Sequence, residues 1–322
     1  MMKDIIVTAL YNLGYILIFP GFLFCFFAGL LLCGIDRKLV AKMQKRVGPP
    51  VLQPFYDFFK LCGKETIIPA AASKTTFLMA PLLGLAALVV LQMFIPIHGW
   101  SAFSGMADII VILYLLLIPA MATMMGGAAS GSPYAGVGLS REMVTVISCE
   151  LPLVLVLLAI GKAVGGASVT FSFSQISNYQ LTNGSLILRP SMIPAAIAFL
   201  MIIPGETGNH PFDTAEAETE ICEGLLAEYS GAPLAVYKLS HSIKMFTLTS
   251  LFTALFLGGI GTGIILVDGI IVFALSVVIT VLTVSLVHAI TARLKIEQVF
   301  KYYWTVVSGL ALISVVLAWY GL

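Results

Sequence analysis

The sequence predicts an all-α integral membrane protein, built as one bundle of about eight transmembrane helices. Hydrophobic residues make up 59% of its 322 residues and charged residues only 10%, and the mean hydropathy is +1.03. Inside a bilayer only helices and closed barrels satisfy their backbone hydrogen bonds, and a helix needs roughly 20 residues to cross the hydrocarbon core. The apolar runs are too long for barrel strands, so the spans are expected to be helical.

Eight apolar runs divide the chain, and no hydrophilic segment between them is long enough to fold alone. Residues 1–322 are therefore expected to form a single polytopic domain. The fifth run is short and stops at Pro204 and Gly205, which indicates a tilted or broken helix beside a buried polar region. The first run lacks the flanks of a cleaved signal and is expected to be an anchor. The expected spans are 10–34, 77–97, 108–125, 142–162, 191–203, 236–258, 270–289 and 303–320.

Basic residues orient the bundle through the positive-inside rule. Eight lysines and arginines lie between Arg37 and Lys74 and three between Arg293 and Lys301, whereas the segments near Trp100 and Asp268 carry none. We therefore expect a multi-pass protein of the cell (plasma) membrane with both termini outside. Its cytoplasmic loops are expected at about 35–76, 126–141, 204–235 and 290–302.

Two loops are expected to carry local structure. In the first, Leu52, Phe55, Phe59 and Cys62 recur at helical spacing, which predicts a short amphipathic helix on the cytoplasmic surface of the membrane. The outer loop 165–190 contains the strand-like stretch SVTFSFSQ.

Composition also excludes several kinds of partner and site. The net charge of +1 argues against a nucleic-acid partner. The five cysteines are scattered without a CxxC pair, so we expect no metal site, disulfide framework or iron–sulfur cluster in this chain.

Seven of the sixteen acids lie between Glu206 and Glu228, between two apolar runs. At 100° per residue, a helix over this segment would align four carboxylates on one stripe, whereas Glu218 would point elsewhere. Like charges at this spacing repel, so some carboxyls would hold a proton near neutral pH where water is scarce. The alternative is a solvated acidic face. The stripe comprises Asp213, Glu216, Glu220 and Glu223.

A second ionisable set is expected inside the bilayer. Glu142 and Glu150 lie roughly on the same side of the fourth span, and Lys244 lies in the sixth span at a depth similar to that of Glu150. We expect Glu150 and Lys244 to pair or to be linked by water. A charge at that depth is costly, which makes a function the default inference and a structural ion pair the alternative. His241 is expected to shuttle protons or to cap a polar contact.

Four ordered blocks carry a resemblance to a known family. They are GIDRKLVAKMQKRVGPPVLQPFYDFFKLCGKE from Gly34, GSPYAGVGLSREM from Gly131, ISCELPLVLVLL from Ile147, and the acid-rich block from Glu206 to Gly231. These blocks are similar to the membrane protein shared by respiratory complex I, where it is the H subunit or mitochondrial subunit 1, and by group 4 energy-converting nickel–iron hydrogenases. The resemblance extends from the first loop to the last span.

Within that family the hydrogenase branch is favoured. Quinone-reducing members have a longer first loop and usually an Asn-Arg pair before the Pro-Phe-Asp, where this chain has Gly208 and Asn209. The SPYAGVGLSREM block and the Cys-Glu-Leu-Pro at Cys149 also resemble the hydrogenase side. The alternatives are a proton-translocating quinone oxidoreductase subunit, or a sulfur-reducing or formate-linked relative.

The resemblance implies a non-redox subunit of an ion-translocating oxidoreductase complex that couples ferredoxin oxidation and proton reduction to H⁺ or Na⁺ translocation. Soluble partner subunits would carry the nickel–iron site and iron–sulfur clusters, and antiporter-like membrane subunits would adjoin this chain, which would hold no catalytic centre or cofactor. The implied docking residues are Asp36, Arg37, Lys38, Lys45, Arg46 and Arg141. The implied ion path comprises Glu142, Glu150, Glu206, Asp213, Glu216, Glu218, Glu220, Glu223, Glu228, Lys244 and His241.

Two interpretations from other classes compete with this one. A stand-alone transporter or channel would bind its cation on the same acids, but the inverted repeats that favour such proteins are not evident in the sequence. A purely structural anchor would tolerate neutral substitutions at Glu150 and Lys244.

Overall fold

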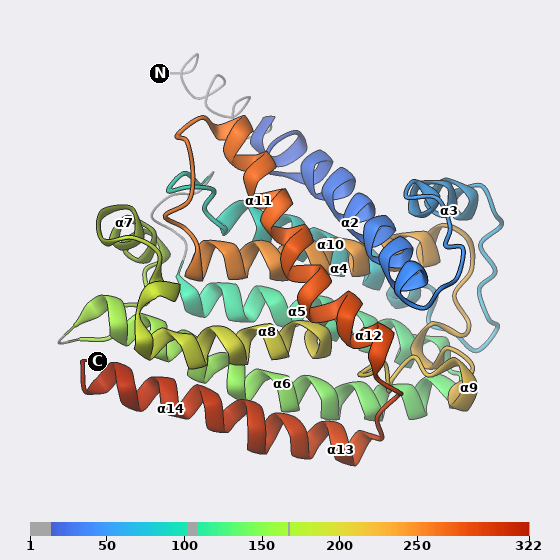
Figure 1. The fold of residues 1–322 in the computed structure, drawn as a ribbon. Helices are drawn as coiled ribbons and strands as arrows, with labels where there is room; N and C mark the ends of the chain where they lie inside the picture. The colour runs from blue at the N-terminus through green and yellow to red at the C-terminus, as the bar shows by residue number, and fades with distance from the viewer. Residues whose placement is uncertain (1–13, 102–107, 167, 322) are drawn as a thin grey trace.

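The computed structural model describes residues 14–101, 108–166 and 168–321, and within these ranges it is helical and contains no sheet (Figure 1). Short 3₁₀ turns precede α8 and α10, and π-helical turns interrupt the last two long helices at Val281–Ser285 and Tyr302–Val307. The helices are α2 (Phe22–Met43), α3 (Gln53–Cys62), α4 (Lys74–Phe94), α5 (Ile109–Ser130), α6 (Pro133–Gly165), α7 (Phe173–Asn183), α8 (Ile193–Thr207), α9 (Glu218–Ile221), α10 (Gly231–Phe256), α11 (Ile265–Thr280), α12 (Leu286–Ile290), α13 (Ile296–Lys301) and α14 (Ser308–Trp319).

Seven helical stretches in the described part of the chain are long and apolar enough to cross a membrane. The eighth expected span, 236–258, corresponds to α10, which is long enough but carries two lysines, a histidine and many hydroxyls. Every residue of α10 from 242 to 256 is buried, because α2, α3, α4, α8 and α11 pack around it. The bundle thus encloses the most polar of its long helices. α3 and α9 lie at one end of the bundle, and α7 and the end of α14 lie at the other (Figure 1).

Several helices extend into segments that were expected to be loops. α2 continues to Met43, and α5 and α6 leave only Gly131 and Ser132 between them in the stretch 126–141. Gly131 ends α5 in the left-handed conformation at a φ of 71°, and Pro133 then begins α6 at a position where a missing N–H costs nothing. The residues 10–13 of the first expected span lie outside the described residues.

The expected break at Pro204 is wrong, because α8 continues through Pro204 and Gly205 to Thr207 and ends at Gly208 in the left-handed conformation. The Tyr303 hydroxyl lies against Gly205, where a Cβ would come within 2.1 Å of it. The same hydroxyl donates a hydrogen bond of 3.1 Å to the carbonyl of Met201. The last long helix thereby supports α8 at the turn where the proline removes a backbone donor.

The acid-rich segment does not form the helix that the stripe requires. Its α-helical part is the four-residue α9, after which Cys222, Glu223 and Gly224 all adopt positive φ angles of 51°, 66° and 50°. A Cβ on Gly224 would come within 2.1 Å of the carbonyl oxygen of Ala215, so the segment folds back tightly on itself. The prediction of one carboxylate stripe is therefore wrong, and each acid takes its own position.

The strand-like stretch SVTFSFSQ also behaves differently from the prediction. Apart from an isolated bridge between Asp108 and Ser172, it enters α7. The residues of α7 that are buried, Phe173, Ile176, Ser177 and Gln180, have the 3.6-residue spacing of a helix face.

The amphipathic helix predicted in the first loop is present as α3. Phe55 and Phe58 pack on Phe26 of α2 with ring centroids 5.9 Å and 5.3 Å apart, whereas Phe59 and Cys62 are exposed. The face of α3 that contacts the bundle is thus centred about one residue earlier in the helix than the predicted face.

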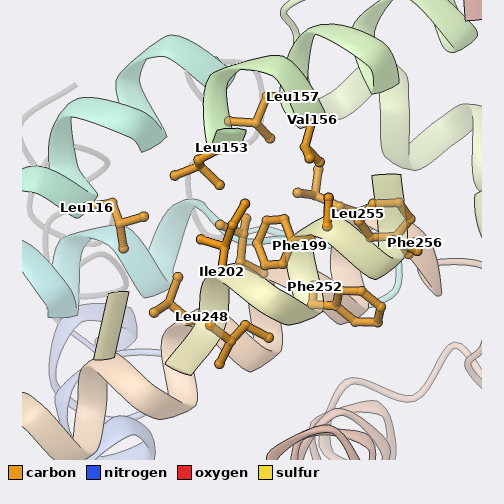
Figure 2. Packing of buried hydrophobic residues seen from close by; sticks show 14 of the residues in the cluster. Leu116, Leu153, Val156, Leu157, Phe199, Ile202, Leu248, Phe252, Leu255 and Phe256 are labelled. Carbon is orange, nitrogen blue, oxygen red and sulfur yellow. The ribbon is translucent and has the colours of Figure 1, made fainter. Parts of the chain in front are cut away.

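Aromatic packing fixes α8 against α10 (Figure 2). Phe199 of α8 is fully buried, and its ring centroid lies 5.7 Å from that of Phe252 and 6.1 Å from that of Phe256. Leu153, Val156 and Leu157 of α6 belong to the same buried cluster. Because the two helices run antiparallel, this packing brings Glu206, two turns after Phe199, level with Lys244, about two turns before Phe252.

Candidate functional site

A cavity of about 610 Å³ lies between α2, α3, α8, α10 and the acid-rich segment. Its wall continues from Lys60 and Lys64 of the α3 end of the bundle to Glu206 and Lys244 between the spans. The cavity therefore joins the loop end of the protein to ionisable groups inside the bundle.

At the inner end of this cavity Lys244 and Glu206 form an ion pair. The Lys244 Nζ lies 3.3 Å from the Glu206 Oε2, and the two side chains are only 11% and 6% exposed. Both residues were predicted on the ion path, but the predicted partner of Lys244 was Glu150. The structure corrects that pairing, because α8 packs directly on α10 and presents Glu206 at the level of Lys244.

Glu142 of α6 lies close enough to this pair to interact electrostatically with both charges. Glu142 and Thr145 line the cavity together, and the Thr145 hydroxyl donates a hydrogen bond of 2.9 Å to the backbone carbonyl of Glu142. A third acid is thus placed beside the ion pair.

Glu216, in the acid-rich segment, lines the same cavity and lies close enough to Glu142 for their charges to interact. Its side chain is open to the cavity, yet protein surrounds it, and this burial raises its pKa from 4.5 to about 7. The carboxylates of Glu142, Glu223 and Asp213 raise this pKa further, and the ammonium of Lys238 lowers it. Glu216 therefore changes its protonation state near neutral pH.

His241 is held by a polar chain and not by an acid. Its Nε2 lies 3.1 Å from the Oδ1 of Asn209, whose Nδ2 donates to the Thr207 hydroxyl over 2.9 Å. Because the amide donates through nitrogen to Thr207, its oxygen accepts the Nε2–H of the imidazole. Asn209 is the residue found where the quinone-reducing relatives were expected to carry arginine.

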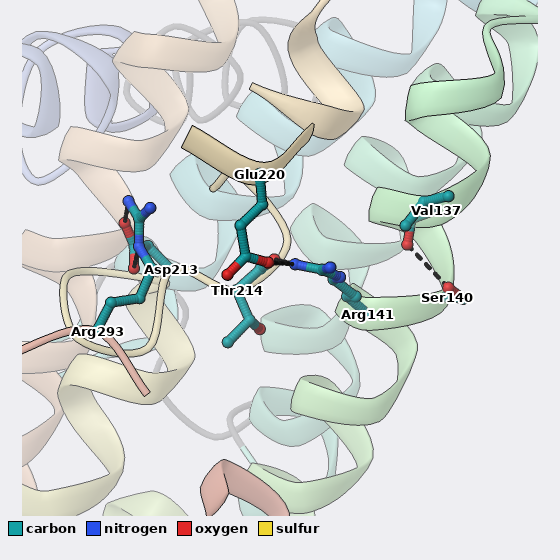
Figure 3. Close-up of polar contacts among 7 residues, drawn as sticks. All are labelled: Val137, Ser140, Arg141, Asp213, Thr214, Glu220 and Arg293. Carbon is teal, nitrogen blue, oxygen red and sulfur yellow. Dashed lines mark hydrogen bonds and ion pairs between the residues drawn. The ribbon is translucent and has the colours of Figure 1, made fainter. Parts of the chain in front are cut away.

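Two acids of the acid-rich segment are bound by arginines (Figure 3). Arg293 donates through Nε and Nη2 to both oxygens of Asp213, over 2.9 Å and 2.5 Å. Arg141 lies 2.5 Å from the Oε2 of Glu220 and also donates to the Thr214 carbonyl over 3.2 Å. Arg141, predicted to dock a partner, thus joins α6 to the acid-rich segment, and Arg293 was not predicted in the site.

Glu150 faces a second, smaller cavity. This space of about 240 Å³ lies between α5 and α6 and is lined mostly by apolar side chains. Glu206 borders both cavities, so it is a residue that the two spaces share. Glu142 and Glu150, expected on one side of α6, thus open onto different spaces.

The remaining predicted residues divide by their exposure. Glu223 lines the large cavity, Glu228 is exposed outside it, and the side chain of Glu218 lies outside the described part of the structure. Asp36, predicted to dock a partner, is buried in the cavity wall and accepts a hydrogen bond of 2.5 Å from the Ser285 hydroxyl. Three predicted docking residues are exposed at the α3 end: Lys38, Lys45 and Arg46.

Arg37 is also exposed, and its guanidinium lies 3.3 Å from a carboxylate oxygen of Asp57 on α3. Among the described residues no three His, Cys, Asp or Glu side chains converge as they would around a metal ion. The site is therefore an array of ionisable groups along a cavity.

A polytopic helical bundle whose helices enclose a cavity lined by ionisable side chains places the chain in the class of multi-pass membrane proteins. The chain belongs to the NADH dehydrogenase family, which it matches over residues 15–319.

Individual relatives come from several complexes. The chain is 32% identical to the H subunit of NADH-quinone oxidoreductase from Rhizobium rhizogenes strain K84, over 96% of this chain and 94% of that protein. It is 36% identical to hydrogenase-4 component C of Escherichia coli strain K12, over 70% of each.

Its fold also matches a chain of the membrane-bound sulfane sulfur reductase, an archaeal respiratory membrane complex. The TM-score is 0.84 at 29% identity, covering 92% of this chain and 96% of that one. These likenesses agree with the predicted family, and they show a membrane subunit of an oxidoreductase-type complex.

Proposed function

We propose that the chain is the membrane-anchoring and ion-coupling subunit of an energy-converting complex of the nickel–iron hydrogenase type. The buried Glu206–Lys244 pair inside the cavity is the observation that carries this proposal, because charges at this depth are costly and mark ion pathways. Soluble partners would carry the nickel–iron site and the iron–sulfur clusters, and antiporter-like membrane subunits would adjoin this chain.

The proposed path uses the order of the acids along the cavity. Glu216 exchanges protons near neutral pH and lies beside Glu142, which in turn lies beside Glu206 and Lys244. A proton that reaches Glu206 weakens its attraction to Lys244, because only the carboxylate is charged. Glu206 also borders the cavity of Glu150, so the path continues there toward the neighbouring membrane subunits. Charge movement in the docked redox arm would drive these steps.

The docking surface is proposed at the α3 end of the bundle. Lys38, Lys45 and Arg46 are exposed there, near the end of α2 and in the loop that follows it. They would bind an acidic face of the soluble arm, so that electron transfer takes place within reach of Glu216.

The hydrogenase branch is supported by the hydrogenase-4 component C relative and by the block GSPYAGVGLSREM. Asn209 supports it too, since its side chain binds His241 and supplies no cation. A proton-translocating quinone oxidoreductase is the second candidate, favoured by the NADH-quinone oxidoreductase relative and by a cavity within the range of about 300–1,000 Å³ that small ligands occupy. A sulfur-reducing or formate-linked relative is the third, favoured by the structural neighbour.

Metal analysis of the gently solubilised complex tests the branch. Nickel together with iron supports the hydrogenase proposal, and iron without nickel rejects it in favour of the other two. Quinone-site inhibitor binding to the same complex then separates those two.

Ion translocation by membrane vesicles tests the coupling role. Glu206→Gln is expected to abolish translocation while the complex still assembles and transfers electrons. Unchanged translocation in this variant would reject the path. Translocation by the purified polypeptide alone in liposomes would instead indicate a stand-alone transporter.

A further inference from the structure

Two histidines that the proposed path does not use meet at the mouth of the cavity. His210 follows α8, and His288 lies in α12, and their ring centroids are 5.1 Å apart with an angle of 45° between the ring planes. His288 lines the cavity, and the His210 side chain is 26% exposed. The pair thus joins a partly exposed ring to one that lines the cavity.

Each imidazole has a carboxylate beside it that is fixed in place. The Nδ1 of His210 lies 3.5 Å from Oδ1 of Asp213, and Arg293 holds that carboxylate through two hydrogen bonds. His288 interacts electrostatically with Asp36, which Ser285 holds from the π-helical turn that precedes α12.

The charged and titratable groups around His288 come from two sides. Asp36 and Arg46 face it from α2 and the loop that follows, and His210 and Asp213 face it from the segment after α8. Both carboxylates line the cavity. An imidazole can accept a proton on one nitrogen and release one from the other.

The chain continues inward from the histidines. Asn209 directly precedes His210, and its side-chain oxygen accepts the hydrogen bond of His241. His241 and Lys244 are neighbours one turn apart on α10. His288, Asn209, His241 and Lys244 thus line the same cavity as Glu206.

We propose that His210 and His288 form the proton intake of the cavity, passing protons from bulk water toward the Glu206–Lys244 pair. Each transfer moves one proton on to the ring and one off it, so no other reactant is required. This inference rests on the proposed function, and it makes the ion that enters at this point a proton. A merely structural histidine pair would pack the loop against α12 and carry no protons.

The test uses membrane vesicles that contain the whole complex, with reduced ferredoxin as electron donor and a membrane-potential dye as readout. The variant is His210→Asn together with His288→Asn, and His98→Asn, beyond the far end of α4, is the control. Near pH 6.5 the double variant is expected to translocate nearly as fast as the unchanged complex. At pH 8.5, where free protons are scarce, its rate is expected to fall by about 100-fold, the lower end of what one acid–base group contributes. Added imidazole restores the rate.

Equal rates for the double variant and the unchanged complex at both pH values would overturn the proposal. So would an equal loss at both pH values that imidazole does not restore, because that is the behaviour of a structural defect. If the double variant does not assemble, each single substitution is measured in the same way, since each removes one ring of the pair.

The Glu206→Gln variant separates a failure of the proton-intake proposal from a failure of the proposed function. If it abolishes translocation while the histidine variants behave like the unchanged complex, only the intake is wrong. If it translocates normally, the ion path itself is wrong.

Discussion

Replacing Lys244 by methionine removes the cation from the ion pair at the centre of the bundle. The pair has an N–O distance of 3.3 Å and side chains that are only 11% and 6% exposed, so solvent screens it little. Methionine keeps most of the side-chain volume. The change therefore reports chiefly on the charge.

The expected magnitude follows from the burial. Removing one partner of a buried pair leaves an uncompensated charge and costs about 3–5 kcal/mol. Glu206 borders the cavity, where water can solvate the carboxylate that has lost its partner, so the lower end of that range applies. The double variant Lys244→Met with Glu206→Gln carries neither charge and is expected to recover most of the loss.

The stability of both variants is measured by thermal unfolding of the detergent-solubilised complex. A variant of an exposed ion pair serves as the matched control. Arg37→Met removes one partner of the Arg37–Asp57 pair, whose side chains are 46% and 39% exposed, and is expected to change stability by about 0–1 kcal/mol. If the double variant is as unstable as Lys244→Met, or if Lys244→Met behaves like Arg37→Met, the Glu206–Lys244 pair does not have the expected effect on stability.

Three further predictions concern other parts of the molecule. The raised pKa of Glu216, about 7 against 4.5, favours the protonated carboxyl in the folded state, so its stabilising contribution is present below pH 4.5 and is lost as the pH rises through about 7. Glu216→Gln is thus expected to raise the unfolding temperature relative to the unchanged protein at pH 8 and to have little effect at pH 5; an equal effect at both would contradict the raised pKa. Phe199→Ala is expected to cost about 3–5 kcal/mol in the unfolding free energy, because its ring is fully buried against Phe252 and Phe256, and a loss under about 1 kcal/mol would contradict this packing. Glu220→Gln is expected to change stability by about 0–1 kcal/mol, because the side chain is 53% exposed, and a larger loss in the same unfolding measurement would show that the Arg141 pair secures the acid-rich segment.

The spans could be predicted from the sequence because bilayer thickness sets the length of an apolar run. The length of an apolar run does not reveal that α10 is enclosed by the other helices. Its lysines and hydroxyls lower its hydropathy below that of the seven spans, and only the packing of its neighbours explains why such a helix lies inside the bundle.

Most of the ionisable residues named from the sequence line one of the two cavities, but their pairings could not be predicted. Counting along helices placed Glu150 and Lys244 at a similar depth, yet depth gives no rotation about the bundle axis. The packing of Phe199 on α10 is what selects Glu206 as the partner. Sequence spacing contains no direct signal of contacts between helices.

The acid-rich segment shows a second limit. Its periodicity favours a helix, but three consecutive residues with positive φ, Cys222, Glu223 and Gly224, end α9 after one turn. Of these three residues, only Gly224 is of a type that indicates a turn from the sequence alone. Arg293 and the two histidines at the cavity mouth were missed because their partners lie about 80 residues away along the chain.

The ratio of charges translocated to electrons transferred, measured in vesicles with Glu206→Gln, tests the central claim most directly. Glu297→Gln, which changes an exposed acid on α13, is the matched control. A ratio near zero is expected for Glu206→Gln and an unchanged ratio for Glu297→Gln. An unchanged ratio for Glu206→Gln in an assembled complex would contradict the claim that the buried ion pair couples electron transfer to ion movement.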